Sequence, residues 1–240
     1  MTTPKSSRTN ARSRRTTGNA EQLPLDPQPG TVTAIQSQTH DPDRVNVFVD
    51  GEFSFGLARD VATDFGLDKD RILDEAALAD VLAREQLHKA TNAALHFLAH
   101  RPRSEGEVRQ RLRKGGYPEA TIEQTLDKLR DWHYVDDSDF ARRWIENRGA
   151  HRPRGARLLA QELRAKGIDP EIMSEALDEI GIDELTDALT IARTRDRQLS
   201  GLEPAVRERR LSGFLARRGY GYDVIRQTLN TLREEAGLPE

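Results

Sequence analysis

The sequence predicts a mainly all-α protein of tandem three-helix repeats in an elongated curved array. A small N-terminal β-hairpin/α cap and a disordered basic tail are predicted to precede the repeats. Two observations lead to this prediction. The tetrapeptide HRPR occurs at His100–Arg103 and again at His151–Arg154, and the segments that follow align without a gap. Only 36% of the 240 residues are hydrophobic, which favours several small cores over a single large one.

Residues 1–29 are predicted to be the disordered tail. The first 20 residues contain Lys5 and four arginines but no acidic residue, and several prolines follow. So few apolar side chains cannot offset the entropy of ordering the chain. No apolar segment follows the basic residues as in a secretory leader, and no run is apolar enough for a membrane span. With no cysteine in the chain, a cytoplasmic protein without disulfides is expected.

Residues 30–86 are predicted to form an acidic cap of strands and helices. Two runs that alternate apolar and polar residues, TVTAIQSQ and VNVFVD, are followed by Asp-Gly and a third such run, EFSFGL. Asp-Gly between alternating runs is a strong signal for a two-residue hairpin turn. We therefore expect three short strands, a short helix from about Ala58, and a second helix from near Asp74 that is broken between Glu85 and Thr91.

Three copies of one helical unit follow, at residues 87–134, 135–182 and 183–240. In each copy, apolar residues four apart predict one helix, and apolar residues at i, i+4 and i+7 predict the next. The counterparts in the three copies are Val108, Leu159 and Leu211; Leu112, Leu163 and Leu215; Ile122, Met173 and Ile225; and Leu126, Leu177 and Leu229. Each unit is expected to bury its apolar face poorly alone and to gain stability by stacking on its neighbours.

Helix starts and stops also recur. Ser104 with Glu107 has the spacing of a capping box, and Asp169–Pro170 has an N-cap followed by a first-turn proline. Glycines at 116, 167 and 219 are expected to end helices in the left-handed conformation. The acidic run Asp136, Asp137, Asp139 is interpreted as a helix N-terminus, because its spacing does not match a calcium-binding loop.

Basic residues are abundant in the repeats, and arginine outnumbers lysine 31 to 6. The excess is explained equally by codon bias and by a need for forked donors that grip carboxylate or phosphate. Because several bases recur in register, we expect a basic stripe that contacts an acidic partner, protein or nucleic acid. The candidate binding residues are Arg101, Arg103, Arg109, Arg113, Lys114, Arg142, Arg143, Arg148, Arg152, Arg154, Arg157, Arg164, Lys166, Arg217 and Arg218.

The chain resembles the RecX family of RecA regulators over residues 87–240, and more loosely over the cap from residue 31. The resemblance is carried by LAHRPRSEGEV, YVDDSDFARRW, ARLLAQELRAKGI and LARRGYGYDVIRQTL, together with the GGY and AKGI turns. The chain departs from the family pattern at Gly115, where a basic residue is common. Residues 1–29 lie outside the pattern.

The resemblance implies a regulator that is not an enzyme and needs no cofactor. Such a protein binds RecA, lies in the groove of the RecA–DNA filament, inhibits its recombinase, ATPase and coprotease activities, and promotes disassembly. It would thereby modulate homologous recombination, DNA repair and the SOS response. A monomeric state and weak direct contact with single-stranded or double-stranded DNA are further expectations.

A helix-turn-helix-like protein that acts on DNA directly is the alternative function. SEGEVRQRLRKGGYPEATIEQTL has the pattern of a helix, a glycine turn and a second helix. However, the second helix offers Glu123 and Asp127, which are poorly suited to a position near phosphates. A scaffold that only joins other proteins is a third class, and the periodicity alone does not separate it from a regulator.

No catalytic or metal-binding constellation is found. The chain lacks a phosphate-binding GxxxxGK[ST] loop, HExxH and GxSxG. His96 and His100 have a spacing that can bind zinc, but no further ligand completes the shell, so they are interpreted as ordinary histidines. Trp132, Tyr134 and Trp144 are of the type that stacks on bases, yet their place around a repeat joint favours packing.

Overall fold

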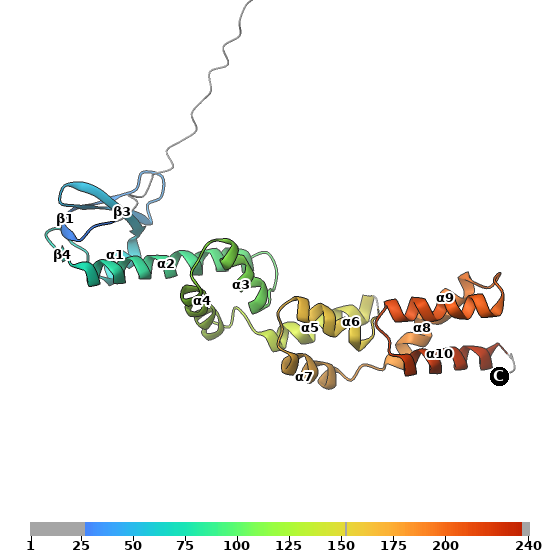
Figure 1. Cartoon of the computed structure of the whole chain (residues 1–240). Helices are drawn as coiled ribbons and strands as arrows, with labels where there is room; N and C mark the ends of the chain where they lie inside the picture. The colour runs from blue at the N-terminus through green and yellow to red at the C-terminus, as the bar shows by residue number, and fades with distance from the viewer. Residues whose placement is uncertain (1–26, 152, 237–240) are drawn as a thin grey trace, which may run out of the picture. The chain divides into compact units, whose positions relative to one another are not determined.

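The computed structural model describes residues 27–151 and 153–236. The predicted tail therefore lies outside the described residues, except for residues 27–29. The described chain is mainly helical, with a small sheet near its N-terminal end (Figure 1), which confirms the predicted fold class. It divides into two compact units between Glu85 and Gln86, within helix α2 (Glu75–Leu98).

The N-terminal unit contains a four-stranded antiparallel sheet in the order β3-β2-β1-β4. The predicted hairpin turn forms at Asp50 and Gly51, whose φ angles of 51° and 91° place both residues in the left-handed region that such a turn requires. The sequence pattern missed β4, because two residues are too few to show alternation. The strands are β1 (Gly30–Ser37), β2 (Arg44–Val49), β3 (Glu52–Ala58) and β4 (Ile72–Leu73).

Glu85 ties α2 to the sheet within this unit. Its carboxylate accepts a hydrogen bond from the backbone N–H of Ala58 at 2.8 Å and pairs with Arg44 at 2.9 Å. The short helix α1 (Arg59–Asp64) follows β3 as predicted. The predicted break between Glu85 and Thr91 is wrong, since α2 is continuous there. The stretch contains neither glycine nor proline, the residues that interrupt helices.

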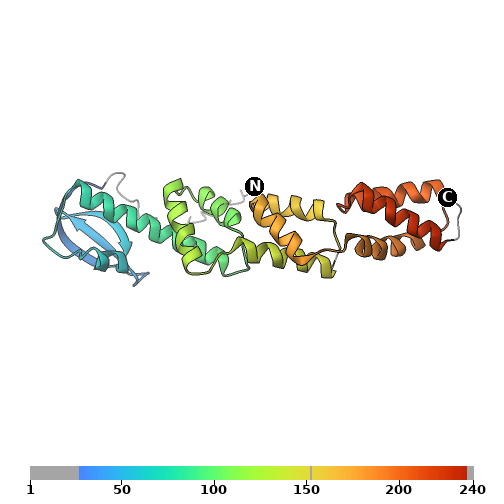
Figure 2. The same ribbon diagram turned by 90° about the horizontal axis from the view of Figure 1, so that it is seen from below.

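The second unit consists of three repeats of three helices (Figure 2). The first repeat comprises the C-terminal part of α2, α3 (Glu105–Lys114) and α4 (Glu119–Asp131). The second comprises α5 (Asp137–His151), α6 (Ala156–Ala165) and α7 (Pro170–Ile180). The third comprises α8 (Glu184–Gln198), α9 (Pro204–Arg217) and α10 (Tyr222–Glu235).

Each repeat has its own hydrophobic core. Most of the predicted periodic positions are buried in these cores, and Leu177 is partly buried. Burial of such a side chain contributes about 1.5–3 kcal/mol relative to leaving it exposed. The buried members are Val108, Leu112, Ile122 and Leu126 in the first repeat, Leu159, Leu163 and Met173 in the second, and Leu211, Leu215, Ile225 and Leu229 in the third.

The predicted helix signals form, with one change. The glycines at 116, 167 and 219 have φ angles of 80°, 80° and 88°, as expected for left-handed helix ends. The Ser104 hydroxyl accepts from the backbone N–H of Glu107 at 3.2 Å, but the Glu107 carboxylate contacts Arg101 and Lys166 in place of the reciprocal bond of a capping box. Asp136 accepts from the backbone N–H of Asp139 and so caps α5.

The first two repeats are joined at the N-terminus of α3. The Ser104 hydroxyl donates to the backbone carbonyl of Lys166 at 2.6 Å, and the backbone N–H of Glu105 donates to the Asp137 carboxylate at 2.9 Å. A Cβ atom on Gly106 would lie 2.5 Å from the Lys166 carbonyl oxygen. Only glycine therefore allows the helix end and the glycine turn of the next repeat to approach this closely.

The second joint, at the N-terminus of α6, has the same plan. The backbone N–H of Gly155 donates to the carbonyl of Arg218 at 2.9 Å, and that of Ala156 donates to the Glu184 carboxylate at 2.6 Å. A Cβ on Gly155 would lie 2.4 Å from the Gly219 carbonyl oxygen. In both joints, an acidic residue at the start of one repeat satisfies a backbone N–H at a helix end of the preceding repeat.

The middle helix of the third repeat begins differently. Helices α3 and α6 start three residues before Val108 and Leu159, whereas α9 starts at Pro204, seven residues before Leu211. The extra turn covers the position that corresponds to Gly155, where Arg207 pairs with Asp196. Among the described residues, no third joint of this kind is formed.

We predict that Gly106→Ala destabilises the protein by about 1–3 kcal/mol, because the added methyl group forces the backbone at Lys166 away from α3. Gly149→Ala is the matched control, since a Cβ at this position in α5 meets nothing within 4 Å. The control should be neutral or stabilising by about 0.5 kcal/mol. Urea unfolding of the two variants measures the difference, and equal stabilities would contradict the close approach.

Candidate interaction groove at the first repeat joint

A groove of about 1010 Å³ lies at the joint between the first two repeats. Its walls come from the end of α2, the segment 99–103, the segment 133–136 and one face of α5. The lining includes four of the predicted basic residues together with aromatic and aliphatic side chains. Its members include Leu95, Leu98, His100, Arg101, Pro102, Arg103, His133, Tyr134, Asp136, Asp139, Phe140, Arg143, Trp144, Asn147 and Arg148.

Trp144 is the central aromatic residue of the α5 wall. Its ring stacks on Phe140 with the centroids 5.9 Å apart, and the cationic groups of Arg148 and Lys166 lie 4.3 and 5.0 Å from its centroid. Its indole N–H donates to the Glu162 carboxylate at 2.9 Å. These contacts fix the ring in one orientation and confirm the packing interpretation for Trp144.

Arg103 is the least exposed cation in the groove. Its guanidinium lies 4.0 Å above the centre of the Phe97 ring, and its side chain is 16% exposed. Its Nε–H has no hydrogen-bond partner among the described residues. Burial and repulsion by Arg101 lower the pKa of Arg103 from its ordinary value, although attraction by Glu107 opposes them. A buried donor without an acceptor is costly in a folded protein, and this one is covered by neighbouring atoms.

Glu107 gathers three cations at the groove. Its carboxylate contacts Arg101 at 2.7 Å and Lys166 at 2.8 Å, and Arg103 is 3.8 Å away. Burial acts to raise the pKa of Glu107, but the hydrogen bonds from Arg101 and Lys166 outweigh it and lower the pKa to about 2. The contact with Lys166 links α3 to the turn of the second repeat, so Glu107 also belongs to the first joint.

Glu162 on α6 has the same role beside α5. It pairs with Arg148 at 3.3 Å and with Arg154, and it accepts the Trp144 hydrogen bond. Two further predicted cations pair with acids on the surface of the second repeat. Arg143 contacts Asp139 at 2.8 Å, and Arg142 contacts Glu179 at 3.5 Å.

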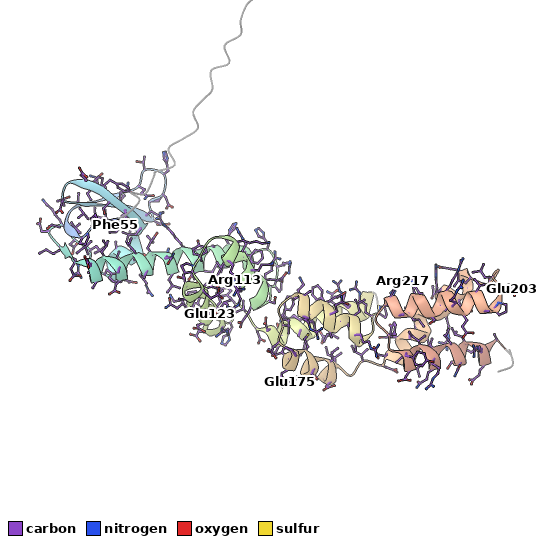
Figure 3. The ribbon with its side chains drawn as sticks, in the orientation of Figure 1. Phe55, Arg113, Glu123, Glu175, Glu203 and Arg217 are labelled. Carbon is purple, nitrogen blue, oxygen red and sulfur yellow. The ribbon has the colours of Figure 1, made fainter. Side chains whose placement is uncertain are left out.

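Arg109 and Arg113 lie on α3 and pair with acids of α4, away from the groove. Arg109 contacts both Glu119 and Glu123, and Arg113 contacts Glu119 at 2.6 Å. Figure 3 labels Arg113 and Glu123 on these two helices. The hydrogen bond from Arg113 is the main cause that lowers the pKa of Glu119 to about 2. Glu123, one of the two acids that argue against a recognition helix, is therefore engaged inside the repeat.

The other predicted cations fall into three groups. Arg218 donates to the carbonyl of Pro153 at 3.3 Å at the second joint. Arg152 lies outside the described residues. The remaining four are exposed, and the described part of the chain shows no ion pair for any of them: Lys114, Arg157, Arg164 and Arg217. Arg217 is labelled in Figure 3.

Two features of the site could not be found by reading the sequence. Glu107 and Glu162 pair with cations from other segments of the chain, and no local sequence motif predicts these pairs. The packing interpretation is wrong for Trp132 and Tyr134, which are 50% and 57% exposed and contact each other edge to face at 6.4 Å. Both lie in or next to the connection between α4 and α5, where no further helix covers them.

Within the described ranges, no three histidine or acidic side chains are grouped as a metal site requires. His96 and His100 contact each other edge to face at 5.5 Å. No helix in the described part of the chain is long and apolar enough to cross a membrane.

Comparison with known families gives a match along most of the chain. The model of the regulatory protein RecX N-terminal domain matches residues 30–74. The models of the first, second and third RecX three-helix domains match residues 90–129, 136–177 and 182–229. Each three-helix match falls on one of the repeats with its own core.

Similar proteins and structures agree with these matches. Regulatory protein RecX of Bacillus velezensis is 34% identical over 208 residues, which cover 85% of this chain and 78% of the relative. Regulatory protein RecX of Clostridioides difficile is 29% identical, with 85% and 96% covered. A crystal structure of regulatory protein RecX has a TM-score of 0.69 at 26% identity and covers 83% of this chain and 98% of its own. The structure of RecX from Lactobacillus salivarius, with a TM-score of 0.57 at 24% identity, covers 62% of this chain and 97% of its own and shares the fold.

The joint carboxylate Asp137 predicts a dependence of stability on pH. Burial is the main cause that raises the pKa of Asp137 to about 6, and the nearby Glu105 and Asp136 add to it, whereas the hydrogen bond from Glu105 acts in the opposite direction. The folded state thus holds this proton more tightly than the unfolded state, so the Asp137 contribution to stability falls as pH rises from about 4 to 6. Asp137→Asn keeps the acceptor for the Glu105 N–H and removes the charge.

We predict that Asp137→Asn is more stable than the unmodified chain at pH 7.5, and that this advantage shrinks by about 1 kcal/mol at pH 4.5. Two pKa units correspond to about 3 kcal/mol, reduced here because the carboxyl is only partly buried. Urea unfolding at both pH values measures the difference. Asp137→Ala, which also removes the acceptor, should be less stable than Asp137→Asn throughout, and a pH-independent advantage of the Asn variant would contradict the prediction.

Proposed function

The chain belongs to the RecX family, and from this premise we propose that it is a non-enzymatic regulator of RecA. In this proposal it binds RecA and the groove of the RecA–DNA filament, and it inhibits the recombinase, ATPase and coprotease activities. The observation that carries the proposal is that four RecX domain models match the chain in order. Roles in homologous recombination, DNA repair and the SOS response, in the cytoplasm, follow from this proposal.

The architecture of the repeats supports binding to a filament. Each repeat closes its own core, and the joints use backbone contacts and a few charged side chains. Proteins built this way offer surface from each repeat, and they suit a partner that is itself extended. The described residues contain no group of three histidine or acidic side chains that could hold a metal ion, and the relatives are named regulatory proteins.

The exposed cations are the candidate contacts with the filament. Arg157 and Arg164 lie on α6 and have no described ion pair, so they can pair with acidic groups of a partner without breaking an internal contact. Lys114 and Arg217 have corresponding positions near the ends of α3 and α9. Arg154 is less suitable for a test, because its charge is engaged by Glu162.

The decisive experiment is a titration of RecA ATP hydrolysis on single-stranded DNA with this protein. Under the proposal, roughly stoichiometric amounts lower the rate. Binding of the protein to naked single-stranded DNA is measured in parallel, because a protein that acts on DNA directly would lower the rate by competing for DNA. An unchanged rate of hydrolysis together with an unchanged filament length would contradict the proposed function.

We predict that Arg157→Glu combined with Arg164→Glu weakens binding to the RecA filament about tenfold. Loss of two charge contacts of up to about 1 kcal/mol each gives a change of this size. Lys69→Glu combined with Arg71→Glu, two exposed residues of the N-terminal unit, makes the same change in net charge and should bind as the unmodified chain does. Equal effects of the two double variants would show that net charge matters and these positions do not.

A further inference from the structure

We propose that the groove at the first joint binds a segment of the partner protein in which a carboxylate stands beside an apolar or aromatic side chain. The inference rests on the proposed function, in which that partner is RecA. In this inference the arginines of the groove contact protein. The alternative is that they contact nucleic acid, and the test below distinguishes the two.

The charge of the groove favours a protein segment over a polyanion. Four arginines line it, but two aspartates, Asp136 and Asp139, line it as well. Directly behind the arginines, Glu107 holds Arg101 and Glu162 holds Arg148. Lys166 and Arg154 pair with the same two glutamates, so six cations are interleaved with four carboxylates, and most of the positive charge is balanced within the protein. A nucleic acid strand needs a groove with a net positive charge along its backbone, whereas a single carboxylate needs only one favourable donor.

Arg103 supplies that donor. The Nη1 atom of Arg103 lies 3.8 Å from the Glu107 carboxylate, which is too far for a hydrogen bond, and its covered Nε–H has no acceptor among the described residues. Because the guanidinium is held on the Phe97 ring, it is already oriented before a ligand arrives. A carboxylate from a peptide would pair at a fixed point with the exposed part of the Arg103 side chain, which lines the groove.

The apolar surface of the groove indicates that the bound partner segment also contains an apolar or aromatic side chain. Leu95, Leu98 and Phe140 line it together with Trp144 and Tyr134. Tyr134 is 57% exposed at the rim, and its aromatic neighbour Trp132 is 50% exposed. Exposed tyrosine, tryptophan and arginine around a concave apolar surface are the residues that contribute most to protein interfaces. The cavity of about 1010 Å³ is large enough for several side chains of a bound segment.

The test compares two double variants, each of which replaces one tyrosine and one arginine by alanine. Tyr134→Ala with Arg143→Ala changes the rim of the groove at two exposed residues that lie outside the hydrophobic cores, and circular dichroism checks that the helical content is unchanged. Tyr222→Ala with Arg226→Ala is the matched control in the third repeat, where an exposed arginine lies 5.9 Å from the centre of an exposed tyrosine ring. Affinity is measured for RecA filaments on an oligo-dT strand and for the naked strand.

The groove variant should bind the filament at least tenfold more weakly and the naked strand within twofold of the unmodified chain, while the control matches the unmodified chain on both. In addition, a photo-crosslinking benzoylphenylalanine in place of Tyr134 should join to RecA. Crosslinks to the DNA strand, a parallel loss of binding to the naked strand, or undiminished filament binding by the groove variant would each overturn the inference alone. If the unmodified chain neither binds RecA filaments nor lowers ATP hydrolysis, the proposed function itself fails.

Discussion

The repeats depend on one close backbone approach, between the N-terminal end of a middle helix and the glycine turn of the next repeat. At the first joint the Ser104 hydroxyl reaches the Lys166 carbonyl, and at the second the Gly155 N–H reaches the Arg218 carbonyl. The donor at each joint is an unsatisfied group of a helix start or its cap, and the acceptor is a carbonyl left free at a helix end. The joint thus uses polar groups that each repeat would otherwise leave to water.

Charge at the joints is organised around carboxylates. Asp137 and Glu184 occupy corresponding positions at the starts of α5 and α8, and each accepts from the first N–H of a helix in the preceding repeat. Glu107 and Glu162 then collect cations from several helices. As a result, much of the apparent excess of arginine near the first joint balances internal acids. The candidate arginines with no described ion pair lie elsewhere: Arg157 and Arg164 on α6, and Arg217 at the end of α9.

Local signals predicted the helices, their caps and the core positions well, because these depend on residues a few positions apart. The left-handed glycines at 116, 167 and 219 are an example, since the spacing of apolar residues placed each of them at a helix end. Features that depend on two distant helices were not predictable in this way. Nothing near Gly106 indicates that its missing Cβ makes room for Lys166, 60 residues later in the chain. The exposure of Trp132 and Tyr134 likewise follows from which helices surround them, and their position around a repeat joint does not reveal it.

The early start of α9 changes what its N-terminal end can contact. Its additional turn, with Pro204 in first place and Arg207 held by Asp196, occupies the site at which α3 and α6 receive the following repeat. A glycine turn packed against the start of α9 would therefore meet a helical turn in place of the helix N-terminus that α3 and α6 present at their joints.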